Sequence, residues 1–78
     1  MKSLRRTMRL LSGFLQYGEI KTTAKKHGID FNEEATRSRF YNIARGKIAP
    51  RESEIPFITD LILLTKPRYE ETKTLIVN

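Results

Sequence analysis

The chain contains no cysteine and no tryptophan, and it has only one histidine. Without cysteine there is no disulfide framework, and the Cys/His sets that hold structural zinc are excluded as well. A chain of 78 residues also buries a smaller fraction of its surface than a larger protein does. The stability of the fold must therefore come from the packing of apolar side chains, with or without a second copy of the chain.

Long hydrophobic runs are absent too. The core of a signal peptide needs about 7 to 15 consecutive apolar residues, and a membrane helix needs about 20. The apolar residues near the N-terminus are interrupted by Ser12 and Gly13, and the run 55–64 is interrupted by two polar residues. We therefore expect no signal peptide and no membrane-spanning helix, and we expect a cytoplasmic location.

The residue sets of common enzymes are missing as well. The sequence has no glycine-rich phosphate loop, no Ser/His/Asp or Cys/His set, and no cluster of histidine and acids at metal-binding spacing. The lone His27 is expected to pack or to cap a helix. The acid pairs Glu33-Glu34 and Glu70-Glu71 are adjacent, so on a helix the two members of each pair point about 100° apart. We predict that the protein is not an enzyme and has no metal or cofactor.

Positive charge, in contrast, is abundant, with a net charge of +6 at pH 7. Residues 1–51 hold twelve Lys/Arg and four Asp/Glu, a net charge of +8, whereas residues 52–78 hold three and five, a net charge of −2. A concentration of one sign attracts partners of the opposite sign, so this distribution points to an acidic partner such as nucleic acid. The alternative is a solvated basic surface that binds nothing.

Apolar side chains recur at helical spacing along most of the chain, which predicts an all-α fold. In the first segment, Leu4, Met8, Leu11 and Leu15 follow one another in steps of four, three and four and so share one face of a helix. We expect one domain over residues 1–78, a small bundle of four to five helices. The predicted helices cover residues 4–17, 19–27, 32–45 and 54–65, with a short fifth helix over 68–74 as one alternative for the tail.

Glycine and proline set the predicted boundaries. Gly28 ends the second helix, because glycine takes positive φ without the strain of a Cβ atom. Pro67 ends the fourth, since the residue before a proline avoids the helical region. The third helix has two alternative starts, with either Asp30 or Asn32 as its cap.

The end of the chain is ambiguous in sequence. Pro67 followed by two acids can open a short helix, whereas residues 72–77 have the composition of a strand. We expect a short helix followed by an extended end.

The fourth helix is apolar around more than half of its circumference, so most of its sides must be buried. Two alternatives follow. The stretch 55–64 either forms the middle of the core or supplies the interface of a homodimer.

The third helix separates two kinds of side chain. Its inward stripe consists of Thr36, Phe40, Ile43 and Ala44. Its opposite side and flanks carry guanidinium, hydroxyl, aromatic and amide groups, namely Arg37, Ser38, Arg39, Tyr41, Asn42 and Arg45. Such groups suit contacts to phosphates and to base edges.

The residues Thr23-Ala24-Lys25-Lys26-His27-Gly28-Ile29 resemble the first helix and turn of helix-turn-helix regulators. In that family a small residue packs where two helices cross, a glycine makes the turn, and an apolar residue follows. Ala24, Gly28 and Ile29 occupy these three places, and the resemblance covers about 28 residues, from Glu19 to Gly46.

The sequence departs from the commonest pattern of that family after the turn. Six and nine residues beyond the glycine the pattern has apolar residues, whereas Glu34 and Arg37 stand here. The inward stripe of the third helix fits only if residues 30–32 lengthen the turn. The chain is in this respect more similar to the tri-helical variants of homeodomain or Myb type.

The resemblance implies a sequence-specific transcriptional regulator that binds double-stranded DNA and associates with the nucleoid when bound. Helix 32–45 would lie in the major groove, while lysines contact phosphates, namely Lys21, Lys25, Lys26 and Lys47. The main alternative is a small adaptor or antagonist that binds an acidic protein through the apolar 55–64 helix and a basic surface. RNA binding finds less support, because the core needs most of the phenylalanines that would stack on bases.

Overall fold

The computed structural model describes residues 3–77, and within that range it contains four α-helices and no strand. The helices are α1 (Ser3–Leu11), α2 (Glu19–Lys26), α3 (Glu34–Ala44) and α4 (Ile55–Val77). A 3-10 turn follows α1 at Ser12–Phe14, and another precedes α4 at Glu52–Glu54. The all-α fold predicted from helical spacing is confirmed.

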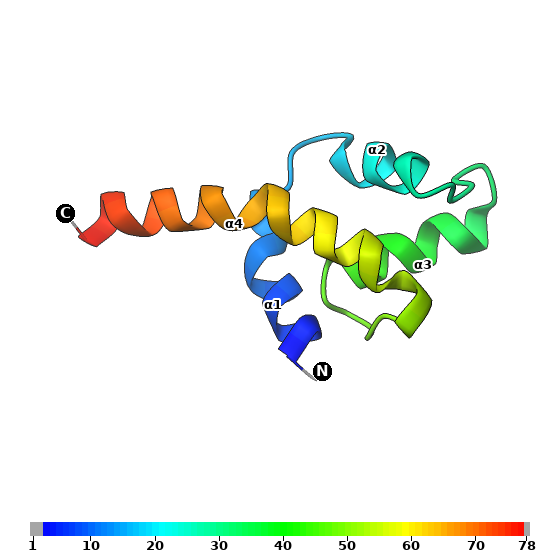
Figure 1. The fold of residues 1–78 in the computed structure, drawn as a ribbon, viewed down its shortest axis with the longest axis horizontal. Helices are drawn as coiled ribbons and strands as arrows, with labels where there is room; N and C mark the ends of the chain where they lie inside the picture. The colour runs from blue at the N-terminus through cyan, green and yellow to red at the C-terminus, as the bar shows by residue number, and fades with distance from the viewer. Residues whose placement is uncertain (1–2, 78) are drawn as a thin grey trace.

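The longest helix, α4, forms the centre of the fold and contacts each of the other three (Figure 1). Phe57, Ile58, Leu61 and Thr65 lie on its inner face, and each is at most 1% exposed. The Thr65 hydroxyl donates a hydrogen bond to the Leu61 carbonyl oxygen at 2.7 Å, so its burial leaves no polar atom unpaired. Burying an apolar side chain of the size of Phe57, Ile58 or Leu61 stabilises a fold by about 1.5–3 kcal/mol. These inner positions of α4 therefore form the middle of the core.

The other helices complete this core from three sides. Phe40 of α3 packs edge to face against Phe57 of α4, with ring centroids 5.0 Å apart. The remaining buried apolar side chains come from α1, α2 and α3, and they are Met8, Leu11, Ile20, Ala24, Ile43 and Ala44.

Pro67 does not end the fourth helix, which corrects our prediction of a separate helix over 68–74 and an extended tail. Instead, α4 continues through Pro67 to Val77. A proline inside a helix costs about 3 kcal/mol, chiefly through a lost hydrogen bond and a clash one turn earlier. Here Leu63, one turn earlier, lies on the exposed side of α4, away from the packed core. The turn after the proline is held by Arg68 and Tyr69, which both contact Phe14.

The C-terminal part of α4 extends beyond the other helices (Figure 1). Residues 70–75 are all exposed, in keeping with the molecule's longest dimension of 44 Å. None of the helices in the described part of the chain is both long enough and apolar enough to cross a membrane.

The first helix is shorter than the predicted 4–17. It ends at Leu11, where Ser12 and Gly13 lower the helix propensity and the chain tightens into a 3-10 turn. Leu15 then adopts an extended conformation and turns the chain towards α2.

Neither predicted cap begins the third helix. The N-cap is Glu33, and it makes no side-chain capping bond to the backbone. Asp30 instead accepts a hydrogen bond from the Asn32 backbone N–H at 2.9 Å, which closes a small turn before the helix. The connection from α2 to α3 is therefore long, as the lengthened-turn prediction requires, although α3 starts two residues later than expected.

A close approach between α1 and the end of α3 requires glycine at position 46. Gly46 has a φ of +75°, and a Cβ atom there would lie 2.5 Å from the Arg5 carbonyl oxygen and 2.7 Å from the Arg9 nitrogen. Both neighbours are backbone atoms, so they cannot move aside without shifting α1.

We therefore predict that Gly46→Ala lowers the free energy of unfolding by about 2 kcal/mol or more, since left-handed strain alone costs about 1–2 kcal/mol. Gly13→Ala is the matched control, because no atom outside its immediate chain neighbours lies within 4 Å of a Cβ there. The control should change the stability by less than about 1 kcal/mol. Urea denaturation followed by circular dichroism measures both, and equal stabilities for the two variants would contradict the packing of α1 on Gly46.

Candidate nucleic-acid interface

The outer face of α3 carries Ser38, Asn42 and Arg45, which are four and three residues apart and so lie above one another along the helix. Ser38 and Arg45 are exposed and Asn42 is half-buried. The opposite face is the inward stripe, in which three side chains are buried and Thr36 is half-buried. The predicted orientation of the third helix is confirmed by this burial.

Two of the arginines that sequence placed in the interface have partners within the protein. The Arg39 guanidinium donates two hydrogen bonds to the Glu54 carboxylate, at 2.6 and 2.7 Å. Arg37 donates to the Phe31 carbonyl oxygen at 3.0 Å, which ties the loop before α3 to its second turn. Both guanidinium groups therefore help to hold α3 in place.

The buried ion pair of Arg39 and Glu54 also perturbs titration. The Arg39 guanidinium holds the pKa of Glu54 below its ordinary value, although partial burial acts in the opposite direction. The Glu54 carboxylate accepts a further hydrogen bond from the Arg51 backbone N–H at 2.7 Å. The charged form of Glu54 is thus the form that the fold stabilises.

Tyr41 orients Arg45 at the C-terminal end of α3. The Arg45 guanidinium carbon lies 5.7 Å from the centroid of the Tyr41 ring, within the range of a cation–π contact. The Tyr41 ring also packs against Phe31 in the loop before α3, with ring centroids 5.5 Å apart, and this contact fixes the position of the ring. Arg45 is exposed but held in a defined place.

The four predicted phosphate-binding lysines do not have the same surroundings. Lys21, Lys25 and Lys47 are exposed and form no ion pair within residues 3–77. Lys26 lies on the side of α2 that faces α4, where its ammonium group is 3.5 Å from Asp60. Three of these lysines are thus fully available to an external phosphate.

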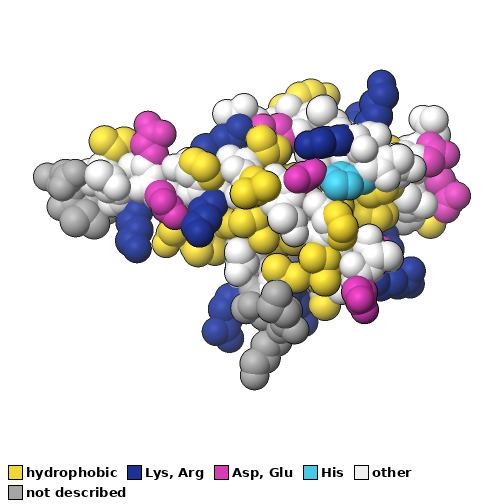
Figure 2. All heavy atoms as spheres, viewed as in Figure 1, with side chains coloured by type: hydrophobic (Ala, Val, Ile, Leu, Met, Phe, Trp, Pro, Cys, Tyr) yellow, Lys and Arg dark blue, Asp and Glu magenta, His cyan; other side chains and the backbone are white. Residues whose placement is uncertain are grey.

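The same acid binds the only histidine. His27 Nε2 lies 2.6 Å from Asp60 Oδ2, and this contact is the main cause of the lowered pKa of Asp60. Figure 2 shows the α4 side of the molecule, with the histidine beside an acidic side chain and hydrophobic side chains along the helix. His27 therefore links α2 to α4, as a packing role requires.

Two arginines of α1, Arg5 and Arg9, also contact the end of α3. The sequence did not predict this contact. The Arg5 and Arg9 Nε atoms donate to the Gly46 carbonyl oxygen, at 3.3 and 3.1 Å. Gly46 stands between Arg45 and Lys47, so α1 brings its own positive charge to this corner. No local signal marks the contact, because the partners are 41 and 37 residues apart.

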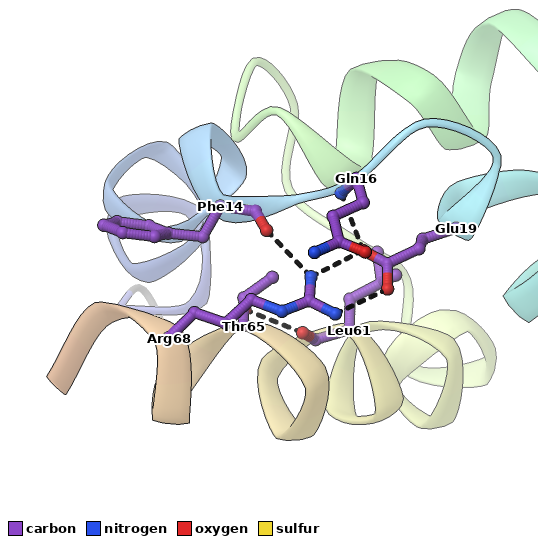
Figure 3. A network of polar contacts seen from close by, with 6 residues as sticks. All are labelled: Phe14, Gln16, Glu19, Leu61, Thr65 and Arg68. Atoms are coloured by element: carbon purple, nitrogen blue, oxygen red, sulfur yellow. Dashed lines mark hydrogen bonds and ion pairs between the residues drawn. The ribbon is translucent and has the colours of Figure 1, made fainter. Parts of the chain in front are cut away.

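A polar network holds the start of α2 against α4 (Figure 3). Arg68 donates two hydrogen bonds to the Glu19 carboxylate, at 2.7 and 2.8 Å, and one to the Phe14 carbonyl oxygen at 2.9 Å. Glu19 also accepts a bond from the Gln16 backbone N–H at 2.7 Å. Arg68 lowers the pKa of Glu19 through these bonds. The network fixes the position of α2 and hence of Lys21.

The resulting surface offers hydrogen-bond donors and positive charge. Within the described range, no group of three or more His, Asp or Glu side chains is arranged to hold a metal ion. The described part of the chain is a small all-α fold of four helices, with exposed cations on α2 and at the C-terminal end of α3. Comparisons with models of protein families, with curated proteins and with solved structures find no match for this chain.

We predict that acid weakens the fold through Glu54. A carboxylate whose pKa is lowered by folding adds stability above the ordinary glutamate value of 4.5, and this stability is lost as the pH falls through the lower folded value. Glu54→Gln should lower the free energy of unfolding at pH 7 by about 1–3 kcal/mol and flatten its decline below pH 4.5.

Chemical denaturation at a series of pH values measures this effect. The exposed Glu71→Gln is the control, and it should leave both the stability and the acid slope unchanged. An acid slope that is as steep in Glu54→Gln as in the unaltered protein would contradict the assignment to the Arg39–Glu54 pair.

Proposed function

We propose that this protein is a helix-turn-helix DNA-binding regulator that places α3 in the major groove of double-stranded DNA. The observation that carries the proposal is the outer face of α3, where the exposed Ser38 and the half-buried Asn42 are aligned with Arg45, the exposed residue that caps the end of the helix. Unpaired lysines lie around it on α2 and after α3. On a basic surface that binds nothing, such an aligned set of hydrogen-bond donors is not expected.

The dimensions of α3 support this placement. Its 11 residues make a helix about 16 Å long, and the major groove, about 12 Å wide, admits an α-helix. Arginine recognises guanine and asparagine recognises adenine through paired hydrogen bonds, and serine bonds to several base edges. We assign base contacts to Arg45, Asn42 and Ser38 on these grounds, and Tyr41 orients Arg45.

Phosphate contacts are assigned to lysines on both sides of α3. Lys21 and Lys25 lie one turn apart on α2, and Lys47 follows the end of α3. The Lys47 backbone N–H donates to the Asn42 carbonyl oxygen at 2.9 Å, which fixes the chain where it leaves the helix. Lys26 contributes less, since Asp60 already binds it.

The long connection between α2 and α3 supports the tri-helical variant of this class over the tight repressor turn. Seven residues, 27–33, separate the two helices, whereas the short form has a turn of three to four. The loop is not loose, because Phe31 packs against Tyr41 and accepts the bond from Arg37.

We predict that the protein binds a random-sequence duplex of about two helical turns with micromolar or tighter affinity at low salt. Fluorescence anisotropy measures the affinity. Removing a phosphate contact with Lys25→Ala should weaken binding to all sequences and reduce the slope of log K against log salt by about one unit. Lys73→Ala, which removes the same charge from an exposed site on α4, is the matched control.

Arg45→Ala should weaken binding by about tenfold or more, since it removes both a base contact and a charge. Circular dichroism confirms that each variant keeps its fold. Absence of binding at micromolar protein, or equal losses for Lys25→Ala and Lys73→Ala, would contradict the proposal.

A second candidate function is supported by the outer side of α4. Leu63 and Leu64 are 67% and 39% exposed, whereas most apolar side chains of the stretch 55–64 are covered by the protein's own core. Contiguous exposed apolar patches mark protein contacts, and we take these two neighbouring leucines as the centre of such a patch. An adaptor that binds an acidic protein, or a homodimer, would use these two leucines and not the buried face.

We predict that self-association, if it accompanies DNA binding, depends on Leu63. Sedimentation equilibrium of the unaltered protein and of Leu63→Ser compares the two, with Thr59→Ser on the same exposed side as control. A dimer that dissociates only in Leu63→Ser supports this surface. A dimer that is equally stable in both variants excludes it.

A further inference from the structure

A hollow of about 580 Å³ lies between the α1–α2 connection and the C-terminal end of α3. Its main lining residues are Leu15, Tyr17, Ile20, Lys21, Tyr41 and Arg45. The volume falls in the range of small-molecule sites, which is about 300–1,000 Å³. The hollow thus has room for a ligand of moderate size.

Apolar and aromatic groups form one part of the hollow. Leu15 packs against the core and Ile20 belongs to it, so both present a fixed apolar surface. The Tyr41 ring is half-buried, whereas Tyr17 is fully exposed, at 103%. A side chain this exposed adds no packing to the fold, and its ring is free to stack on a ligand.

Positive charge forms the other part. Lys21 from α2 and Arg45 from α3 both line the hollow, and no carboxylate does so in the described part of the chain. Neither cation is ion-paired in residues 3–77. The contact between Arg45 and the Tyr41 ring holds the guanidinium at the edge of the hollow, ready for an anion.

We propose that this hollow binds a nucleoside monophosphate unit. The base would lie against the apolar floor and stack on Tyr17, and the phosphate would bind Lys21 and Arg45, with Arg45 held by its contact with the Tyr41 ring. A simple anion leaves the Tyr17 ring unused, and a neutral aromatic molecule leaves both cations unused. A nucleotide joins the two chemistries in one ligand.

The nucleotide has two sources. It is either a free mononucleotide or one unit of a bound nucleic acid whose base is turned out of its stack. The hollow shares Lys21 and Arg45 with the proposed DNA interface, whereas Ser38 and Asn42 do not line it. Binding of a free mononucleotide goes beyond the DNA-binding function proposed above, and binding of one unit of a bound DNA rests on that function.

Amide chemical shifts measured by NMR during titration with adenosine 5′-monophosphate test the site. Saturable changes are expected at residues 15–21 and 41–45, and not along residues 70–75 of α4. Adenosine and inorganic phosphate, titrated separately, should each bind about tenfold more weakly or worse, because each makes only one of the two kinds of contact.

Three variants locate the binding. Tyr17→Ala and Arg45→Gln should each weaken nucleotide binding by about tenfold or more. Lys66→Gln removes a charge from an exposed position on α4 that does not line the hollow, and it should bind like the unaltered protein. Tyr17 is fully exposed, so Tyr17→Ala keeps the fold, which circular dichroism checks.

A competition experiment with a DNA duplex separates the sources. Because duplex and mononucleotide share Lys21 and Arg45, displacement assigns the hollow to a unit of the bound DNA when Tyr17→Ala also weakens duplex binding. Simultaneous binding, or displacement with an unchanged duplex affinity in Tyr17→Ala, assigns it to a free nucleotide. Absence of saturable shifts at millimolar nucleotide, or an equal loss in Lys66→Gln and Arg45→Gln, overturns the proposal. If duplex still binds in that case, only the hollow is rejected; if nucleotide binds and duplex does not, only the DNA-binding function is rejected.

Discussion

The packing of α4 against the other three helices is the constraint on which the rest of the structure depends. Its buried stripe, centred on Ile58 and Leu61, supplies the middle of the core. Four ion pairs among the described residues then tie α4, or the turn before it, to the neighbouring helices: Arg39 with Glu54, Lys26 with Asp60, His27 with Asp60, and Arg68 with Glu19. The apolar stripe provides most of the stability, because ion pairs between exposed groups contribute little net free energy. Among the paired groups Glu54 is buried, and its pair with Arg39 is expected to contribute more. The ion pairs instead fix where α2 and α3 stand.

This arrangement divides the positive charge of the chain into two groups. The guanidinium groups of Arg37, Arg39 and Arg68 donate hydrogen bonds to other groups of the protein, and these bonds hold loops and helices in position. Other cations remain uncovered on α2 and around the end of α3, where Arg45 is oriented by Tyr41. The net charge of +8 over residues 1–51 therefore overstates how much charge is open to a partner. The proposed DNA interface rests on the uncovered group.

The sequence predicted most of the fold, because helical spacing alone identifies the inward stripe of α3 and the apolar side of α4. The prediction that the fourth helix ends at Pro67 was wrong. The residue before a proline disfavours helical geometry, but the contacts of Arg68 and Tyr69 with Phe14 hold the following turn in place. In the candidate site, the same spacing correctly placed Ser38 and Arg45 on the exposed side, but it also placed there Arg37 and Tyr41, which are half-buried and contact Phe31. The spacing did not predict the partners of the α3 arginines, because Glu54 lies 15 residues from Arg39 and no periodic signal connects them. The packing of α1 on Gly46 was not predicted either, because its partners are also far apart in the sequence.

We propose that the outer face of α3 and the lysines around it bind duplex DNA. Mapping amide chemical shifts during addition of a short duplex tests this most directly, because every surface of the protein is observed at once. Saturable changes are expected at Ser38, Asn42, Arg45 and Lys47 and on the Lys21–Lys25 side of α2, with little change along the exposed end of α4. Saturable changes centred on α4, or no saturable change at low salt, would contradict it.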